Sequence, residues 1–461
     1  MPRHHKKTLR SPDTPPPRVR RGQKRSLKAV SLFSSAGIGD LGVSAAGIQV
    51  ILANELLGSR VELYRENFDH EIIEGDIHLK KREILQAARG RLNGESLFLL
   101  YATPPCQGMS SNGLGKLKAE VASGRRDQED SRNRLIIPTM EIARALRPTW
   151  LLLENVPAME TTVIRTHGAR LENIVDFVTR QLGKEYTGRA EVIACEDYGV
   201  PQRRKRLIAL FTRDPAAKAY FEANGGTFFT ASMKEPKCTL RDAIEHLPSL
   251  DARPGRNAAP DFNPYHYVPV MSDLKYLWVR HTRQGDTAFN NQCINPACRH
   301  KGTPGHRDVR IGGKWVSSKS IPIHCAQCGQ LLPRPHVVEK GRPRLLRGFH
   351  SAYRRMLWDE PARTLTQNFI YEASDNKLHP TQNRVLSVYE AMVLQTISKY
   401  AYTFRIDGKD ISAARIAEVI GESVPPYVIH KICNMMVAAS QGETKTPSAK
   451  ARRLKRQSAR T

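Results

Sequence analysis

The sequence predicts an α/β fold: a largely parallel sheet with helices on both faces, interrupted by a smaller, irregular domain that contains short strands. Three observations support this prediction. Apolar runs of strand length alternate with helix-like segments through the first half of the chain. The alternation stops between Thr212 and about Pro361, where Pro, Gly, aromatic and Cys residues dominate. Helical patterning then returns at 385–398 and after Pro426.

The first elements are expected to be a strand, a glycine-containing turn, a helix and a second strand. The first strand spans residues 30–33 and leads into the turn at 34–39. The helix follows at roughly 40–46 and the second strand at 50–54. Further strands are predicted at 97–101, 150–153, 192–194 and 207–211. Strands that alternate with helices indicate a sheet whose neighbouring strands are mainly parallel.

Charge is unevenly distributed along the 461 residues. The chain has 72 Lys and Arg against 45 Asp and Glu, and its net charge of +27 favours a polyanionic partner such as nucleic acid. Residues 1–28 carry +9 and residues 443–461 carry +6, and we expect both to be disordered basic tails. Residues 213–360 carry +10. A hydrophobic content of 40% excludes a mainly disordered chain, and no apolar run approaches the about 18 residues of a membrane span.

The turn after the first strand has the composition of a nucleotide-cofactor loop. Phe33-Ser-Ser-Ala-Gly37-Ile-Gly39 offers small residues that let the backbone approach a ligand at a helix N-terminus. A packing glycine would explain this pattern equally well. Glu55 ends the second predicted strand, where an acid commonly binds a ribose. Asp76 is expected to end the third strand beside it, although either acid would also suit a solvated loop.

Three further motifs accompany predicted strands. Thr103-Pro-Pro-Cys106-Gln-Gly places a thiol directly after a strand, and Trp150-Leu-Leu-Leu-Glu154-Asn-Val places a carboxylate at the tip of the next. Gln202-Arg-Arg204-Lys-Arg206 then leads a basic cluster into an apolar strand. A carboxylate beside a thiol can protonate a substrate if burial raises its pKa. An isolated Cys is more often buried and inert, but the flanking prolines and glycine favour a functional one.

The order of these motifs resembles the bacterial type of the DNA cytosine-5 methyltransferase family. The similarity continues in Pro361-Ala-Arg-Thr, His379-Pro and Ile420-Gly-Glu-Ser-Val-Pro-Pro. It implies a Rossmann-like, S-adenosylmethionine-dependent catalytic domain at 29–212, completed by a C-terminal return at 361–442. The intervening residues would form a target recognition domain at 213–360.

The resemblance also implies a covalent mechanism on a cytosine flipped out of duplex DNA. Cys106 would add to C6 of the base, Glu154 would protonate N3, and Arg204 and Arg206 would hold the base. The segment 108–130 is similar to the mobile loop that the family closes over flipped DNA. The implied cofactor contacts are Phe33, Gly37, Gly39, Glu55, Asp76, Ile77, Pro104, Leu135, Ser423 and Val424. The chain departs from the family pattern at Ser35, Ile38, Leu56 and Glu422, which bears on cofactor contacts.

Four cysteines in the predicted recognition domain have the spacing of a zinc site. Cys293-x4-Cys298 and Cys325-x2-Cys328 are separated by 26 residues. Two short Cys pairs are typical of a tetrahedral thiolate site in which each pair forms a knuckle. We therefore expect a structural zinc in a ribbon-like element, with unlinked thiols as the alternative.

The sequence thus predicts a sequence-specific DNA cytosine-5 methyltransferase with a solitary or restriction–modification role. We expect double-stranded DNA as the partner, no membrane, a monomer, a cytoplasmic and nucleoid-associated location in a bacterium, and possibly a cognate endonuclease acting on the same site. Two alternatives stay open: a tRNA cytosine-5 methyltransferase, and a catalytically silent zinc-ribbon regulator that binds DNA.

Overall fold

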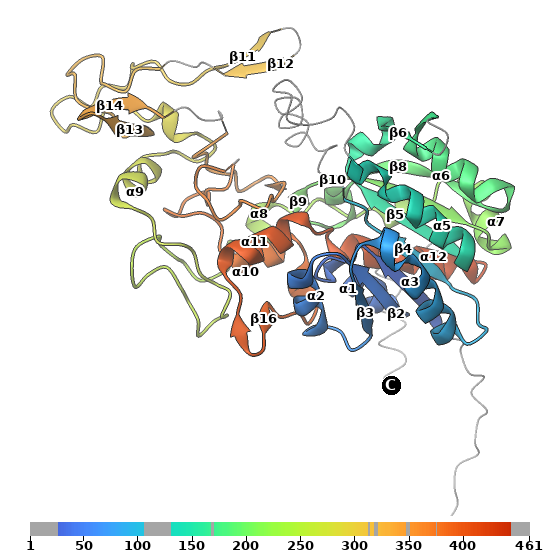
Figure 1. The fold of residues 1–461 in the computed structure, drawn as a ribbon. Coiled ribbons are helices and arrows are strands. Elements are labelled where there is room, and N and C mark those ends of the chain that lie inside the picture. The colour runs from blue at the N-terminus through green and yellow to red at the C-terminus, as the bar shows by residue number, and fades with distance from the viewer. Residues whose placement is uncertain are drawn as a thin grey trace, which may run out of the picture.

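The computed structural model describes residues 26–105, 131–166, 170–311, 314–317, 321–346, 351–374 and 376–443. Its centre is a seven-stranded sheet with the order β3-β2-β1-β4-β5-β10-β8 (Figure 1). The neighbours from β3 to β5 are parallel, whereas β10 runs antiparallel to both β5 and β8. The sheet strands are β1 (Leu27–Leu32), β2 (Ile48–Glu55), β3 (Glu71–Glu74), β4 (Leu99–Ala102), β5 (Trp150–Asn155), β8 (Thr187–Ala194) and β10 (Lys205–Thr212).

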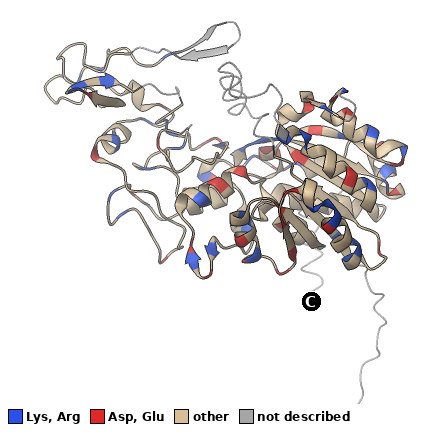
Figure 2. Ribbon diagram, viewed as in Figure 1, with Lys and Arg blue, Asp and Glu red and all other residues tan. Residues whose placement is uncertain are grey.

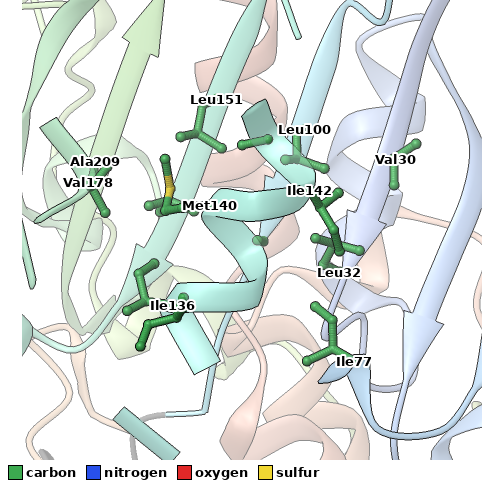
Figure 3. Close-up of a cluster of buried hydrophobic side chains, with 14 of the residues drawn as sticks. Val30, Leu32, Ile77, Leu100, Ile136, Met140, Ile142, Leu151, Val178 and Ala209 are labelled. Atoms are coloured by element: carbon green, nitrogen blue, oxygen red, sulfur yellow. The ribbon is translucent and has the colours of Figure 1, made fainter. Parts of the chain in front are cut away.

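Helices cover both faces of the sheet, as predicted, because successive strand residues point to opposite sides. Val30 and Leu32 of β1 pack with α3 and α5, while Ala29 packs with α1 and α12 on the other face. Figure 3 shows the first face, where Met140 and Ile142 of α5 lie against Leu100, Leu151 and other strand side chains. The helices of these layers are α1 (Ile38–Ala45), α3 (Ile77–Leu92), α5 (Ile136–Leu146), α6 (Ile174–Leu182), α7 (Pro215–Ala223) and α12 (Pro426–Ser440).

The C-terminal return joins the catalytic body through a short parallel ladder. β15 (Ala362–Arg363) pairs with β9 (Gln202–Arg203), in register Ala362 with Gln202. A third apolar cluster connects Ala36 and Ile38 near the first turn with helices of the return. The helices that contribute to this third cluster are α2 (Gly58–Arg65), α8 (Leu240–Ile244), α10 (Val388–Leu394) and α11 (Ala413–Glu422). The return therefore closes over the carboxyl end of β1.

The predicted recognition domain is built on an apolar cluster that includes Trp278, Phe289 and Tyr353 and that extends to Leu378 and Val385 of the C-terminal return. Figure 1 shows it on the side of the molecule away from the large sheet, with α10 and α11 between. Lys and Arg outnumber Asp and Glu in 213–360, and many of them are visible along this side (Figure 2). Its elements are α9 (Asp273–Arg280), β11 (Asp308–Ile311), β12 (Lys314–Ser317), β13 (His336–Glu339) and β14 (Arg342–Leu345). Smaller hairpins elsewhere are β6 (Val163–Arg165) with β7 (Leu171–Asn173) and β16 (Arg405–Ile406) with β17 (Lys409–Asp410).

Several expected boundaries need correction. β1 begins at Leu27, so the basic N-terminal tail cannot extend to residue 28. The helix expected at 385–398 is α10 alone, followed by a single 3-10 turn, since Thr396 adopts a left-handed φ of 64°. Residues directly after the expected domain boundary at 213 still pack against the large sheet. Tyr220 of α7 and Phe228 pack into the same cluster as Trp150, so this stretch belongs to the catalytic body.

Within the part of the chain that the structure describes, no helix combines the length and the apolar character that crossing a bilayer requires.

A buried ion pair fixes the start of α10, and its loss should destabilise the protein. Arg384 Nη1 lies 2.7 Å from Glu390 Oε2, and Arg384 Nη2 lies 2.7 Å from Glu390 Oε1. Both side chains are buried. Burial alone would raise the pKa of Glu390, but the charge of Arg384 outweighs it and holds the pKa below its ordinary value. The stabilisation is therefore complete above the ordinary Glu pKa and is lost as the pH falls towards the folded-state value.

Arg384→Met should lower the free energy of unfolding by about 3–5 kcal/mol, because it leaves a buried, unpaired carboxylate. The matched control is Arg344→Met, since Arg344 also binds a glutamate, Glu339, through two nitrogens but at an exposed site. That change should cost at most about 1 kcal/mol. Urea denaturation of the two variants measures both values. Equal losses would contradict the stabilising role assigned to the buried pair.

Candidate functional site

The predicted cofactor loop lies between β1 and α1 and is held by Glu55 at the end of β2. Ser35 N donates to Glu55 Oε2 at 2.9 Å, and Leu57 N donates to Glu55 Oε1 at 2.9 Å. Burial raises the pKa of Glu55, although these backbone bonds oppose the shift. The loop also needs unusual backbone: φ is 58° at Phe33 and 80° at Gly37. Glu55 therefore shapes the loop through its two carboxylate oxygens.

Asp76 does not end a strand but caps α3, where its side chain accepts from His78 N at 2.8 Å. Strand β3 ends two residues earlier, at Glu74. Gly75 N donates to Glu55 O at 2.9 Å, which keeps this turn beside the end of β2. Ile77 is buried in the first turn of α3. The two predicted residues are thus brought to the same edge of the sheet as Glu55.

A pocket lies between the cofactor loop and the C-terminal return. Four predicted site residues line it: Gly39, Glu154, Ser423 and Val424. The others that line it, which sequence reasoning did not assign to the site, are Ser34, Ser35, Ala36, Ile38, Asp40, Tyr101, Thr103, Val419 and Glu422. Of these, Asp40 left a signal in the sequence, as an acid within an otherwise apolar helical stretch.

The pocket suits the S-adenosylmethionine expected from the sequence. A Cβ placed on Gly39 would lie 2.5 Å from the Tyr101 hydroxyl, so only glycine leaves this space open. The walls combine carboxylates, hydroxyls and apolar side chains, a mixture that matches a ligand with a ribose, charged groups and an aliphatic chain. Phe33 and Pro104 are not among its lining residues, although Thr103, which is, donates through Oγ1 to Phe33 O at 2.9 Å. Leu135 immediately precedes α5 and packs against the core of the first face.

Glu154 and Arg206 form an ion pair at the tip of β5. The antiparallel register places Glu154 opposite Ile208, and Arg206 Nε lies 2.8 Å from Glu154 Oε1. The Glu154 side chain is 8% exposed and that of Arg206 is 13% exposed. Burial raises the pKa of Glu154, while the charges of Arg206 and Arg204 oppose the shift. A carboxyl group with a raised pKa can hold a proton for a bound base.

Arg204 is fully buried and connects the catalytic body to the return. Its guanidinium donates to Leu365 O at 3.0 Å, to Gly421 O at 3.0 Å and to Ser423 O at 2.7 Å. Gln202 supports the same junction, because it accepts from Leu365 N at 2.8 Å. The structure therefore brings Arg204 near Glu154 but gives its guanidinium backbone carbonyls as partners. This arrangement fits a residue that positions the pocket wall.

Cys106 and the glycine-containing segment 108–130 lie outside the described residues. The backbone leading to Cys106 is nevertheless held in place. Asn155 Nδ2 donates to Pro104 O at 3.0 Å and so ties the end of β4 to the strand that carries Glu154. Sequence reasoning assigned no role to Asn155, although its place directly after Glu154 was a usable signal.

The four cysteines with zinc-site spacing come together in the recognition domain. Their sulfur atoms all lie within 4.8 Å of one another. Cys293 Sγ is 3.7 Å from Cys328 Sγ, and Cys298 Sγ is 3.8 Å from Cys325 Sγ. Four thiolates around one Zn²⁺, at Zn–S distances of about 2.3 Å, have sulfur–sulfur separations of about 3.8 Å. The cluster therefore has the size of a tetrahedral zinc site.

The cluster is supported by turns and by one buried arginine. Cys325 O accepts from Gly329 N at 3.0 Å, and Gly329 has a φ of 71°, which favours glycine at this turn. The Arg334 guanidinium donates to the carbonyls of Asn291, Pro304 and Pro322, each at 2.7 Å. These bonds join the segments on which both cysteine pairs are carried.

Known proteins that are similar to this chain are DNA methyltransferases, and one with a solved structure shares its fold. Residues 27–438 match the family model described as C-5 cytosine-specific DNA methylase. The type II methyltransferase M1.HgaI of Avibacterium volantium is 28% identical over 89% of this chain and 98% of its own length. M.AgeI of Thalassovita gelatinovora is 25% identical over 87% and 97%, respectively. A crystal structure described as a prophage-encoded DNA modification methyltransferase of E. coli shares the fold, with a TM-score of 0.54, 18% identity, and coverage of 90% of this chain and 100% of that one.

Proposed function

The chain belongs to the C-5 cytosine-specific DNA methylase family and is a DNA (cytosine-5) methyltransferase, and we propose that it modifies one cytosine within a specific duplex sequence as part of a restriction–modification system. The observation that carries the site assignment is the Glu154–Arg206 pair, which adjoins a pocket shared by the cofactor loop and the return. A proton-holding carboxyl group beside a cofactor pocket is what methylation at C5 requires.

The proposed chemistry begins with the weak nucleophilicity of C5. The Cys106 thiolate forms a bond to C6, and Glu154 gives its proton to N3, so that the electron pair gathers at C5. Bound S-adenosylmethionine would supply the electrophilic methyl group, and C5 would bond to it as the bond from sulfur to methyl breaks, while the N3 proton returns to Glu154. A base then removes the C5 proton, the C6–Sγ bond breaks, and the thiolate is restored. Arg206 supports Glu154 in this scheme, and Arg204 positions the pocket wall.

In the proposed assignment Glu55, Asp76 and Ile77 hold the nucleoside part of the cofactor. Gly37, Gly39, Ser423 and Val424 border its amino-acid part, and Phe33, Pro104 and Leu135 complete the walls. The four cysteines would bind a structural zinc. The zinc-bearing domain, with its excess of Lys and Arg, would read the duplex, and phosphate contacts would make binding sensitive to salt.

The restriction–modification role is supported by the names of the relatives, both of which are type II methyltransferases. In that role the protein would act as a monomer in the bacterial cytoplasm, and a partner endonuclease would cut the same sequence when it is unmethylated.

Transfer of tritium from methyl-labelled S-adenosylmethionine tests the proposal. Wild-type protein should label mixed-sequence duplex DNA at C5 of cytosine, and Cys106→Ser should leave no measurable turnover. Cys238→Ser is the control, because this half-buried thiol lies outside the four-cysteine cluster and is not a proposed catalytic residue. Bisulfite sequencing of DNA from cells that express the chain should then show methylation at one sequence. Label in tRNA but not in duplex DNA would overturn the proposed substrate.

A further inference from the structure

Among the residues that the structure describes, those lining the cofactor pocket include three carboxylates, Asp40, Glu154 and Glu422, and no Lys, Arg or His. Two of the three have a cation close by. Arg206 pairs with Glu154 at 2.8 Å, and Arg60 Nη2 lies 3.1 Å from Glu422 Oε2. The charge of the pocket wall is therefore balanced at these two positions.

Asp40 differs from the other two because its hydrogen-bond partners are hydroxyl groups. Ser31 Oγ donates to Asp40 Oδ1 at 2.7 Å, and the Tyr64 hydroxyl donates to Asp40 Oδ2 at 2.7 Å. The residue is 1% exposed. Among the described residues, no ion pair involves Asp40. Burial raises its pKa to about 6 even though both hydroxyls favour the charged form. A buried carboxylate of this kind is stabilised when a cation enters its surroundings.

The position of Asp40 indicates which part of the cofactor would supply that cation. Tyr101 lines the pocket together with Asp40 and Glu154. The Tyr101 hydroxyl lies beside Gly39, the residue before Asp40, since a Cβ on Gly39 would be 2.5 Å from it. Burial, followed by the charges of Glu154 and Asp40, raises the pKa of Tyr101. The methyl group must reach a base held at Glu154. The sulfur that carries this methyl group must therefore occupy the same part of the pocket.

We propose that Asp40 is the counter-ion of the sulfonium centre of S-adenosylmethionine, and that it lets the pocket select this cofactor over the uncharged-sulfur product, S-adenosylhomocysteine. The inference rests on the proposed function, and it adds a specificity-determining residue to it. Its functional consequence is weaker product inhibition, because loss of the positive charge on methyl transfer removes one attraction that holds the ligand.

Isothermal titration calorimetry with three ligands tests this assignment. The probes are S-adenosylmethionine, S-adenosylhomocysteine and sinefungin, which carries an ammonium-bearing carbon in place of the sulfonium. Asp40→Asn keeps the shape of the side chain and removes its charge. It keeps one acceptor oxygen, and the hydroxyl of Ser31 or Tyr64 that meets the new amide group can rotate to accept from it. The substitution should weaken binding of the two cationic ligands by about tenfold and that of S-adenosylhomocysteine by less than about twofold. Asp176→Asn, an exposed position in α6, is the control and should change none of the three.

The pH dependence of binding provides a second measurement. Affinity for S-adenosylmethionine should fall as the pH drops below about 6, because Asp40 takes up a proton, and affinity for S-adenosylhomocysteine should fall less. The neighbours of Asp40 stay neutral in this range: burial raises the pKa of Tyr64, Tyr101 and Cys433 and lowers that of His70 to about 4. Glu154 also lines the pocket and also titrates, so both series are repeated with Asp40→Asn, in which the difference between the two ligands should no longer change near pH 6.

Equal weakening of all three ligands by Asp40→Asn would overturn the sulfonium assignment, as would a wild-type affinity ratio that is constant from about pH 5.5 to 7.5. In either case DNA methylation by the wild type would leave the proposed function intact. Wild-type protein that binds neither cofactor form would overturn the proposed cofactor site together with this inference.

Discussion

Replacing Glu154 by Gln is expected to lower kcat for cytosine methylation by about 10²- to 10⁴-fold, the range typical of a lost general acid. Gln keeps the size of the side chain but cannot transfer a proton to N3. Arg206, 2.8 Å from Glu154 Oε1, would keep a neutral partner, so the local fold should survive. Single-turnover transfer of labelled methyl groups measures the effect.

The pH profile separates loss of the acid from loss of structure. In the wild type, burial raises the pKa of Glu154, so the rate should fall as the pH rises through that value and the acid loses its proton. This limb should be missing in Glu154→Gln. Glu160→Gln, six residues along the chain and exposed, is the matched control and should retain wild-type rates. A wild-type rate in Glu154→Gln would refute the proposed role of the carboxyl group.

Loss of zinc is expected to unfold the cysteine-bearing part of the recognition domain. Structural Zn²⁺ sites contribute apparent binding free energies of about 10–16 kcal/mol that become folding free energy. The purified protein should contain one zinc per chain by elemental analysis. Cys325→Ser should lose the metal and destabilise the recognition domain by on the order of 3 kcal/mol or more.

The effect should be local, because none of the four cysteines lines the cofactor pocket. S-adenosylmethionine affinity should stay within about twofold of the wild type, while specific DNA binding should fall below detection. Cys238→Ser again serves as control, since it removes a thiol outside the cluster. If the wild type is free of zinc and still binds its DNA sequence, the cysteines do not form a required metal site.

The sheet could be predicted from the sequence because its strands are short apolar runs with clear ends. β4 and β5 were anticipated to within a few residues. The helices α7 and α8 were missed, because their segments lie within a stretch rich in Pro and aromatic residues. Their place in the catalytic body depends on contacts such as Phe228 against Trp150, which no local pattern reveals.

The position of Glu154 at the end of a strand could be predicted, and the structure places this residue in the pocket wall. The role expected for Glu55 stays a prediction. The partners of the site residues could not be predicted, because they come from distant parts of the chain. The pairing of Glu154 with Arg206 depends on the antiparallel register of β10. The carbonyl partners of Arg204 lie 161 to 219 positions further along the chain. Asp40 was overlooked because its importance arises from the hydroxyls and pocket that surround it.

The pocket is lined by residues from near the start and near the end of the chain, so it can form only late in synthesis. Arg60 and Glu422, which meet beside the pocket, are 362 positions apart. At synthesis rates of about 5–20 residues per second, roughly 20–70 s pass between the translation of the two. During that interval a nascent chain has the nucleoside-binding loop but not the opposite wall. Incomplete or prematurely terminated chains would therefore be unable to methylate DNA, and the cell would gain protection only from fully translated molecules.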